Sequence, residues 1–379
     1  MPNRASSRHT APGFLELARV LQSAANGKRV IGGVFGLEAI VLGQENNLDW
    51  PFLRPETLHL ASARGALCLL ADLVRPQTVW LPSYLCPALV DALSAANVAW
   101  KFFPVSKHLC CESAEWLRQI VPNDIVLRIH YFGFPNTDPV LLEAAARGAL
   151  LVDDAAQALL TAGMGTGASA IIYSPRKFLG VPDGGCLVTL TPGLRSDTDL
   201  PAVPAAWWSD ALSAVALRRE FDSGNSTREW FPRFQEAEQA VPSRPCAMSH
   251  LTRGLLRRGV DYGAISTRRR LNYQALLEML AEFALLPTLA PGAVPLGFPV
   301  RCPSRDAIRT RLFDEQIFPP VHWHLKACVP DAFADSHRLS AELMTLPCDQ
   351  RYDEEDMKRV AKAFKAAYES AVGLKHTKG

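Results

Sequence analysis

Two short apolar stretches, each ending in polar residues, decide the fold of this 379-residue chain. The first is Val152-Asp153-Asp154-Ala155-Ala156-Gln157, and the second is Ile171-Ile172-Tyr173-Ser174-Pro175-Arg176-Lys177-Phe178-Leu179-Gly180. We interpret them as two strands, the first ending in a carboxylate and an amide, the second in a serine and a lysine. Short apolar runs that alternate with helical stretches are typical of an α/β protein with a largely parallel sheet.

This arrangement of polar residues suits an enzyme that uses pyridoxal 5'-phosphate (PLP). A lysine amine forms a Schiff base with the PLP aldehyde, and a carboxylate keeps the pyridine nitrogen protonated, so that the ring absorbs negative charge from Cα. We expect Lys177 to be that lysine and to move the proton between the substrate and the cofactor. Asp154 is the expected partner of the ring nitrogen and Gln157 of the ring oxygen. Asp153 is expected to face the other side of the strand, because side chains alternate there.

Each of these residues has a plainer explanation when it is taken alone. An acid such as Asp154 often caps a helix, a glutamine such as Gln157 is common in turns, and most lysines extend along the surface into solvent. The aromatic and apolar neighbours of Lys177 favour an amine withdrawn from water. The joint spacing, and not any single residue, predicts the cofactor pocket.

Other stretches supply the remaining walls of such a pocket. Ser62-Ala63-Arg64-Gly65 opens a predicted helix, where free backbone amides and the helix dipole favour an anion such as the cofactor phosphate. Ser174 is placed to reach the same phosphate. Tyr84 follows a strand and is a candidate to stack on the ring face. The alternatives, an ordinary helix cap at Ser62 and a core aromatic at Tyr84, stay open.

The bulk composition narrows the class of protein. The 40 basic and 38 acidic residues give a net charge of +2, so there is no electrostatic case for nucleic acid or an anionic membrane as partner. No window reaches the roughly 18 continuous apolar residues of a membrane helix. Nine scattered cysteines are expected to be reduced thiols. We therefore expect a cytoplasmic globular protein with a loose polar tail at its first ten residues.

Two further features carry no prediction of a metal or nucleotide site. His322-Trp323-His324 has a metal-like spacing, but no cluster of acids or cysteines accompanies it. The glycine-rich stretch 163–167 lacks the following helix of a dinucleotide or phosphate loop.

The periodicity predicts a regular alternation of elements up to residue 192, and a different region beyond it. Helices are expected at 61–73, 87–96, 114–121 and 139–147, and strands at 78–82, 99–105, 124–131, 149–152, 168–173 and 186–190. Residues 193–245 are expected to be an irregular connection with one or two helices. One long helix is expected at 249–283, followed by a small α+β region with elements at 294–301, 305–316 and 354–370.

Several of these stretches together resemble a known family. Residues 152–157 are similar to the (E/D)DAAQ segment of the PLP-dependent sugar aminotransferases of the DegT/StrS type, and residues 173–185 to their Ser…Lys…Gly-Gly segment. The stretches 81–88, 130–133, 268–273 and 346–352 resemble, in order, the aromatic strand end, the His-x-x-Gly strand end, a helix and the closing Asp-Gln-Arg-Tyr segment. The similarity runs from about residue 55 to 365.

The resemblance implies the PLP-dependent transferase fold type I. Its expected parts are an N-terminal tail and arm (1–50), a PLP-binding large domain around a mixed, mostly parallel seven-stranded sheet (51–245), and a smaller C-terminal α+β domain (246–379). It also implies a homodimer with active sites at the interface. The chain departs from the family in its phosphate segment at 62–65 and near 244–249, where the family's Asn-Tyr-Arg segment has no clear counterpart.

The resemblance further implies an enzyme and its site. The expected reaction is transamination, with glutamate as donor and a keto group as acceptor, for example on a nucleotide-linked sugar of polysaccharide biosynthesis. Lys177 would be the catalytic lysine, with Asp154, Gln157, Ser174, Ser62, Ala63, Arg64 and Tyr84 around the cofactor. His130, Tyr131 and His322 are the candidate substrate residues. Other PLP reactions (elimination, aldol cleavage or a sensory role) and a non-catalytic protein with a retained fold stay open.

Overall fold

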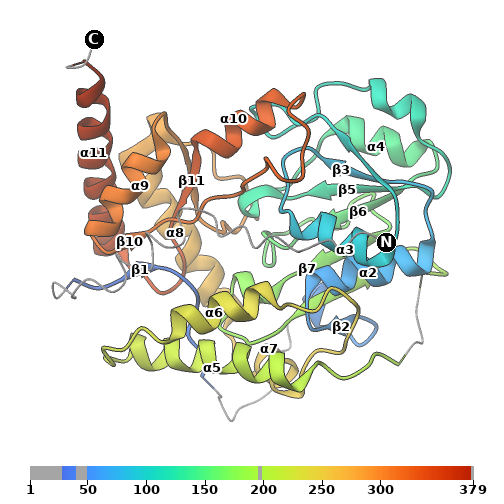
Figure 1. The fold of residues 1–379 in the computed structure, drawn as a ribbon, viewed down its shortest axis with the longest axis horizontal. Helices are drawn as coiled ribbons and strands as arrows, with labels where there is room; N and C mark the ends of the chain where they lie inside the picture. The colour runs from blue at the N-terminus through green and yellow to red at the C-terminus, as the bar shows by residue number, and fades with distance from the viewer. Residues whose placement is uncertain (1–27, 40–48, 195–198, 377–379) are drawn as a thin grey trace, which may run out of the picture.

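The computed structural model describes residues 28–39, 49–194 and 199–376, and at its centre lies a seven-stranded sheet. The strand order is β2-β8-β7-β6-β5-β3-β4 (Figure 1). The strands are β2 (Leu58–Leu60), β3 (Val79–Pro82), β4 (Trp100–Phe103), β5 (Ile125–Ile129), β6 (Leu150–Asp154), β7 (Ala170–Tyr173) and β8 (Gly185–Thr189). The neighbours from β4 through β3, β5 and β6 to β7 are parallel, and β8 runs antiparallel to both β7 and β2. The expected mixed, mostly parallel sheet of seven strands is confirmed.

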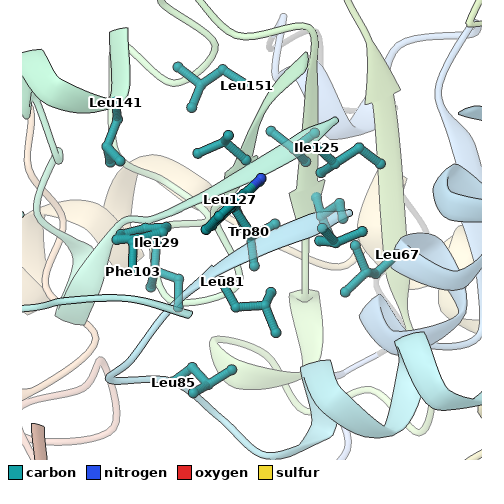
Figure 2. Packing of buried hydrophobic residues seen from close by; sticks show 14 of the residues in the cluster. Leu67, Trp80, Leu81, Leu85, Phe103, Ile125, Leu127, Ile129, Leu141 and Leu151 are labelled. Carbon is teal, nitrogen blue, oxygen red and sulfur yellow. The ribbon is translucent and has the colours of Figure 1, made fainter. Parts of the chain in front are cut away.

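Helices α2 (Ala63–Val74), α3 (Ala88–Ala96) and α4 (Pro139–Ala146) connect the strands of this sheet. Their apolar residues pack on the sheet in the largest core cluster, as Figure 2 shows for Leu67 of α2 and Leu141 of α4 beside side chains of β3 and β5. The fully buried strands β3 and β5 are almost continuously apolar, as expected for strands covered on both faces. Trp80 is the one side chain of β3 with a polar group to satisfy, and its Nε1 donates to Asp124 Oδ2 at 3.0 Å.

Two helices follow the sheet, and they lie side by side in Figure 1. They are α5 (Ala205–Asp222) and α6 (Trp230–Gln239), and together we call them the α5–α6 hairpin. The prediction of one or two helices in this region is confirmed.

The single long helix expected at 249–283 is wrong. The structure has two helices, α7 (His250–Arg258) and α8 (Tyr262–Leu280). The break comes at Gly259, which ends α7, and at Asp261, whose side chain accepts a hydrogen bond from Ala264 N and so caps α8. A second difference lies at 114–121, where the chain forms only a short 3-10 helix, η2 (Glu115–Gln119).

A second core forms from the C-terminal elements, which lie on one side of the molecule in Figure 1. It contains β9 (Phe298–Arg301) paired antiparallel with β11 (Leu343–Leu346), and helix α11 (Glu354–His376), which packs against both α8 and α9 (Arg305–Asp314). Helix α10 (Ala334–Glu342) leads into β11. The division into domains at residues 50 and 245 stays a prediction.

The segment 31–38 connects this second core to the large sheet. Its strand β1 (Ile31–Gly32) pairs in parallel with β10 (Ile317–Phe318), and Gly32 N donates to the Tyr352 hydroxyl at 2.6 Å. At its other end Glu38 N donates to Gly180 O at 2.8 Å. The backbones touch here, since a Cβ atom on Gly180 would lie 1.7 Å from Gly36 O. The tail predicted at the first ten residues lies outside the described residues. Within the described ranges, no helix is both long and apolar enough to span a bilayer.

Candidate active site

A cavity of about 540 Å³ lies at the carboxyl ends of β6 and β7. In open α/β sheets this edge is the usual place of a ligand site. Seven of the eleven residues predicted for the site line the cavity: Ser62, Ala63, Arg64, Asp154, Ser174, Lys177 and His322. A larger cleft of about 1670 Å³, bordered by Arg218, Arg268 and Arg351, contains none of the eleven. The smaller cavity is therefore the candidate active site.

Asp153 and Asp154 are adjacent in sequence, but their side chains have different surroundings. Asp153 is fully buried, and its carboxylate accepts from Arg128 Nε at 2.7 Å and from Gly165 N at 2.8 Å, with His130 Nε2 at 3.1 Å. Burial acts to raise the pKa of Asp153, yet His130 and Arg128 outweigh it and lower that pKa. Asp153 is thus a structural anion, and the alternation along β6 leaves Asp154 to line the cavity, as expected.

The Asp154 carboxylate has one hydrogen bond within the described chain, from Ala156 N to Oδ1 at 2.9 Å. Burial raises its pKa, while the charge of Lys177 acts to lower it. A second oxygen of this buried carboxylate is therefore available to a ligand.

Lys177 ends a short 3-10 turn, η4 (Pro175–Lys177), that follows β7 directly. Its backbone N donates to Ser174 O at 3.1 Å, which fixes the turn. In the described ranges its side-chain Nζ makes no hydrogen bond or ion pair. Asp154 and His322 line the same cavity, and the charge of Lys177 acts to lower the pKa of both. A half-buried amine without a partner in a cavity is suited to react with a ligand.

The start of α2 forms the wall beside Ser174. Ser62 is the N-cap, and its Oγ accepts from Gly65 N at 3.0 Å, so the cap expected as the plainer alternative is present. Ala63 and Arg64 form the first turn of α2, and both line the cavity. Backbone N–H groups in a first turn have no hydrogen-bond acceptor within the helix. The Arg64 side chain makes no hydrogen bond or ion pair within the described residues. This wall is suited to an anion.

The other four predicted residues, Gln157, Tyr84, His130 and Tyr131, are not among those that line the cavity. Gln157 Oε1 accepts from Phe132 N at 2.8 Å, and its buried Nε2 has no acceptor among the described residues. The Tyr84 ring packs against Tyr131 and Trp323, with ring centroids 5.7 and 5.3 Å away. Tyr131 Oη donates to Tyr84 O at 2.5 Å, which couples the two tyrosines. His130 is the fourth, placed after β5 with Nδ1 accepting from Asn136 N at 3.0 Å.

His322 enters the cavity from the segment after β10. Its Nδ1 lies 3.0 Å from Thr345 Oγ1 on β11, and its ring meets Phe132 edge-on at 5.6 Å between centroids. Burial, with a further contribution from the charge of Lys177, lowers the pKa of His322 to about 3. The imidazole is therefore neutral near pH 7 and can orient a polar group of a ligand without adding charge.

Sequence reasoning missed one whole side of the cavity, which the α5–α6 hairpin supplies. Its lining residues are largely apolar and aromatic: Trp207, Ala211, Ala214, Val215, Trp230, Phe231, Phe234 and Ala237. It also missed Arg176, which lines the cavity and pairs with Glu238 of α6. Trp207, Trp208 and Trp230 were the available signal. Three tryptophans in a region otherwise rich in polar residues indicate that the region packs against another part of the protein.

No protein-family model and no curated protein matches the chain. Solved structures match it over most of its length. DesV from S. venezuelae, in complex with a ketimine intermediate, is 22% identical, with 93% of this chain and 94% of that one covered at a TM-score of 0.62. The sugar aminotransferase CalS13 from Micromonospora echinospora is 15% identical, with 88% and 99% covered and a TM-score of 0.59. DesI, in the presence of its TDP-sugar product, is 18% identical, with 85% and 83% covered and a TM-score of 0.60. The expected fold, PLP-dependent transferase fold type I, is confirmed by these likenesses.

Proposed function

We propose that this protein is a PLP-dependent aminotransferase, with glutamate as amino donor and a keto group of a small molecule as acceptor. The observation that carries the proposal is the meeting of Lys177 and Asp154 in one cavity whose far wall is the anion-suited start of α2. DesV was solved with a ketimine, the imine through which an amino group passes to a keto substrate. That chemistry agrees with the residues placed here.

The residues present fit the cofactor. Asp154 offers a free carboxylate oxygen for the protonated ring nitrogen, and Gln157 Nε2 is a buried donor that needs an acceptor such as the ring oxygen. The amides of Ala63 and Arg64, with the hydroxyls of Ser62 and Ser174, would hold the phosphate. When bound, PLP supplies an electron sink for the bond-breaking at the substrate carbon.

Each side chain would then have a defined role. Lys177 Nζ would attach the cofactor, and the same amine would move the proton at the substrate carbon that carries the amino group. The Asp154 carboxylate would pair with the protonated ring nitrogen. Neutral His322 orients the acceptor. Tyr84 and Tyr131 pack together and would support the cavity from outside its lining.

The acceptor we propose is a keto sugar, carried by a nucleotide in the manner of the TDP-sugar product of DesI. CalS13 is a sugar aminotransferase of the same fold. The aromatic side chains of the α5–α6 hairpin offer apolar faces for the rings of such a ligand. We further propose that the protein works as a cytoplasmic homodimer in polysaccharide biosynthesis, and light scattering of the purified protein would check the dimer.

A visible absorption spectrum tests the proposal. The purified protein with PLP should show the band of the lysine-bound cofactor, and glutamate should convert it to the band of the pyridoxamine form. Keto sugars linked to nucleotides should then restore the first band, while glutamate alone should not.

The matched variants are Lys177→Ala and Lys326→Ala. Lys326 is exposed and lies outside the cavity, so its variant should behave as the wild type. Borohydride should fix the cofactor covalently to the wild type and to Lys326→Ala, and not to Lys177→Ala. A cofactor band that no amino donor moves would overturn transamination, and a protein without any band would overturn the PLP assignment.

A further inference from the structure

The wall of the cavity that is suited to an anion carries a second arginine, which the sequence analysis did not predict to be part of the site. Arg176, the residue before Lys177, lies in the turn η4 and lines the cavity together with Arg64. Burial lowers the pKa of Arg176 to about 10, and the positive charge of Arg64 adds to the effect. Two guanidinium groups therefore come together beside the first turn of α2.

The charge of Arg176 is balanced by an element that is remote in sequence. Its guanidinium forms a close ion pair with the Glu238 carboxylate of α6. The Arg176 side chain is 20% exposed and that of Glu238 is 35% exposed, so the carboxylate can turn toward solvent more readily than the guanidinium. The nearby Asp183 cannot serve instead, because Ser249 N and Oγ occupy it at 2.6 Å each, together with the Thr252 hydroxyl.

A phosphate group at this wall would compete with Glu238. A phosphate held by the α2 amides and Arg64 carries nearly two negative charges, and an adjacent carboxylate repels it. Arg176 can exchange the carboxylate for the phosphate and remain paired, so the exchange leaves no uncompensated buried charge. The exchange also breaks a bond between the Lys177 turn and the α5–α6 hairpin.

We propose that Arg176 is a phosphate-binding residue of this site and that Glu238 is the anion that the phosphate displaces from it. The proposal rests on the proposed function, since it takes the phosphate to be that of PLP. The affinity for the cofactor would then depend on the ion pair between Arg176 and Glu238. Glu238 lies on α6, outside the segments predicted to bind the cofactor.

The test compares PLP with pyridoxal, which has the same aldehyde and no phosphate. Dissociation constants come from absorbance titrations of the wild type, Arg176→Gln, Arg176→Lys and Glu238→Gln. Arg176→Gln should weaken PLP by about 10- to 100-fold and leave pyridoxal unchanged, because a charge-assisted hydrogen bond is lost. Arg176→Lys should lie between. Glu238→Gln should strengthen PLP about three- to tenfold, again without effect on pyridoxal.

Two exposed residues of α6 provide matched controls, Arg233→Gln and Glu236→Gln, neither of which lines the cavity. Both should bind PLP as the wild type does. Equal effects of Arg176→Gln on PLP and pyridoxal, or weaker PLP binding in Glu238→Gln, would overturn the inference. Thermal unfolding of each variant separates lost affinity from lost folding.

Inorganic phosphate separates this inference from the proposed function. Calorimetry should detect phosphate binding to the wild type and not to Arg176→Gln. A protein that binds neither aldehyde but binds phosphate through Arg176 would contradict the PLP assignment and support the anion site. A protein that attaches both aldehydes at Lys177 equally well with and without Arg176 would support the PLP assignment and overturn the role of Arg176.

Discussion

Ser62 and Gly185 are in backbone contact: a Cβ atom on Gly185 would lie 2.1 Å from the carbonyl carbon of Ser62 and 2.4 Å from Ala63 N. Gly184 N also donates to Ala61 O at 2.8 Å. The start of α2 is therefore seated directly on the first residue of β8. Since β8 follows the Lys177 turn, this contact sets the position of the anion-suited wall relative to the lysine.

The first prediction concerns this contact. Gly185→Ala should lower the free energy of unfolding by about 2 kcal/mol or more, because backbone and not a flexible side chain must shift. Gly254→Ala is the control, since Gly254 lies in α7 and has no atom within 4 Å of an added Cβ. That variant should be more stable by about 0.5–1 kcal/mol. Urea unfolding of both variants checks this, and equal stability of the two would contradict it.

The second prediction separates the two aspartates of β6. Asp153→Asn should lower stability by about 3–5 kcal/mol, because it leaves the buried Arg128 without its counter-charge. Asp154→Asn keeps an acceptor for Ala156 N and should cost less than about 1 kcal/mol, yet lower transamination at least about 100-fold. Urea unfolding and single-turnover spectra measure the two effects. A stable Asp153→Asn or a fully active Asp154→Asn would contradict the assignment.

The third prediction is a pH dependence that comes from His322. Its pKa is lowered to about 3 in the folded chain from an ordinary value of 6.5, so between these values the unfolded chain binds a proton that the folded chain does not. Stability should therefore fall as the pH drops below 6.5, with a contribution of up to about 1.4 kcal/mol per pH unit from this group.

Urea unfolding at about pH 5 and about pH 7 checks the sign. His322→Gln should reduce the pH slope by this contribution. Thr345→Val removes the hydrogen-bond partner and keeps the imidazole, so it should lower stability at both pH values and keep the slope. A slope unchanged in His322→Gln would show that the imidazole is not the titrating group.

The fourth prediction uses the coupled tyrosines behind the cavity. Tyr131→Phe removes the hydroxyl that donates to Tyr84 O and should cost about 1–3 kcal/mol. The Tyr84 hydroxyl is buried without a partner among the described residues, so Tyr84→Phe should change stability by less than about 0.5 kcal/mol. Unfolding midpoints of the two proteins give the comparison, and the reverse order would contradict the hydrogen-bond assignment.

The sequence was informative where local pattern and local structure agree. The alternation along β6 predicted that Asp154 and not Asp153 would line the site, and the spacing to the next strand placed Lys177 opposite. It was less informative at the helix break, although Gly259 and the capping Asp261 were visible signals. Arg176 is next to Lys177 in the sequence, but its partner Glu238 lies on a helix that only the tertiary fold brings near. The tryptophans at 207, 208 and 230 indicated a surface to be covered, but only the tertiary fold shows that the α5–α6 hairpin covers this cavity.

The segment 31–38 has a mechanical consequence. It is hydrogen-bonded to β10 and to Tyr352 at one end and to Val215 and Gly180 at the other, and Arg351 donates to Gly33 O and Val34 O in between. Gly180 is three residues from Lys177, and its backbone is in close contact with that of Gly36. A displacement of the C-terminal elements would therefore reach the backbone beside Lys177 through this short segment, without passing through the cavity.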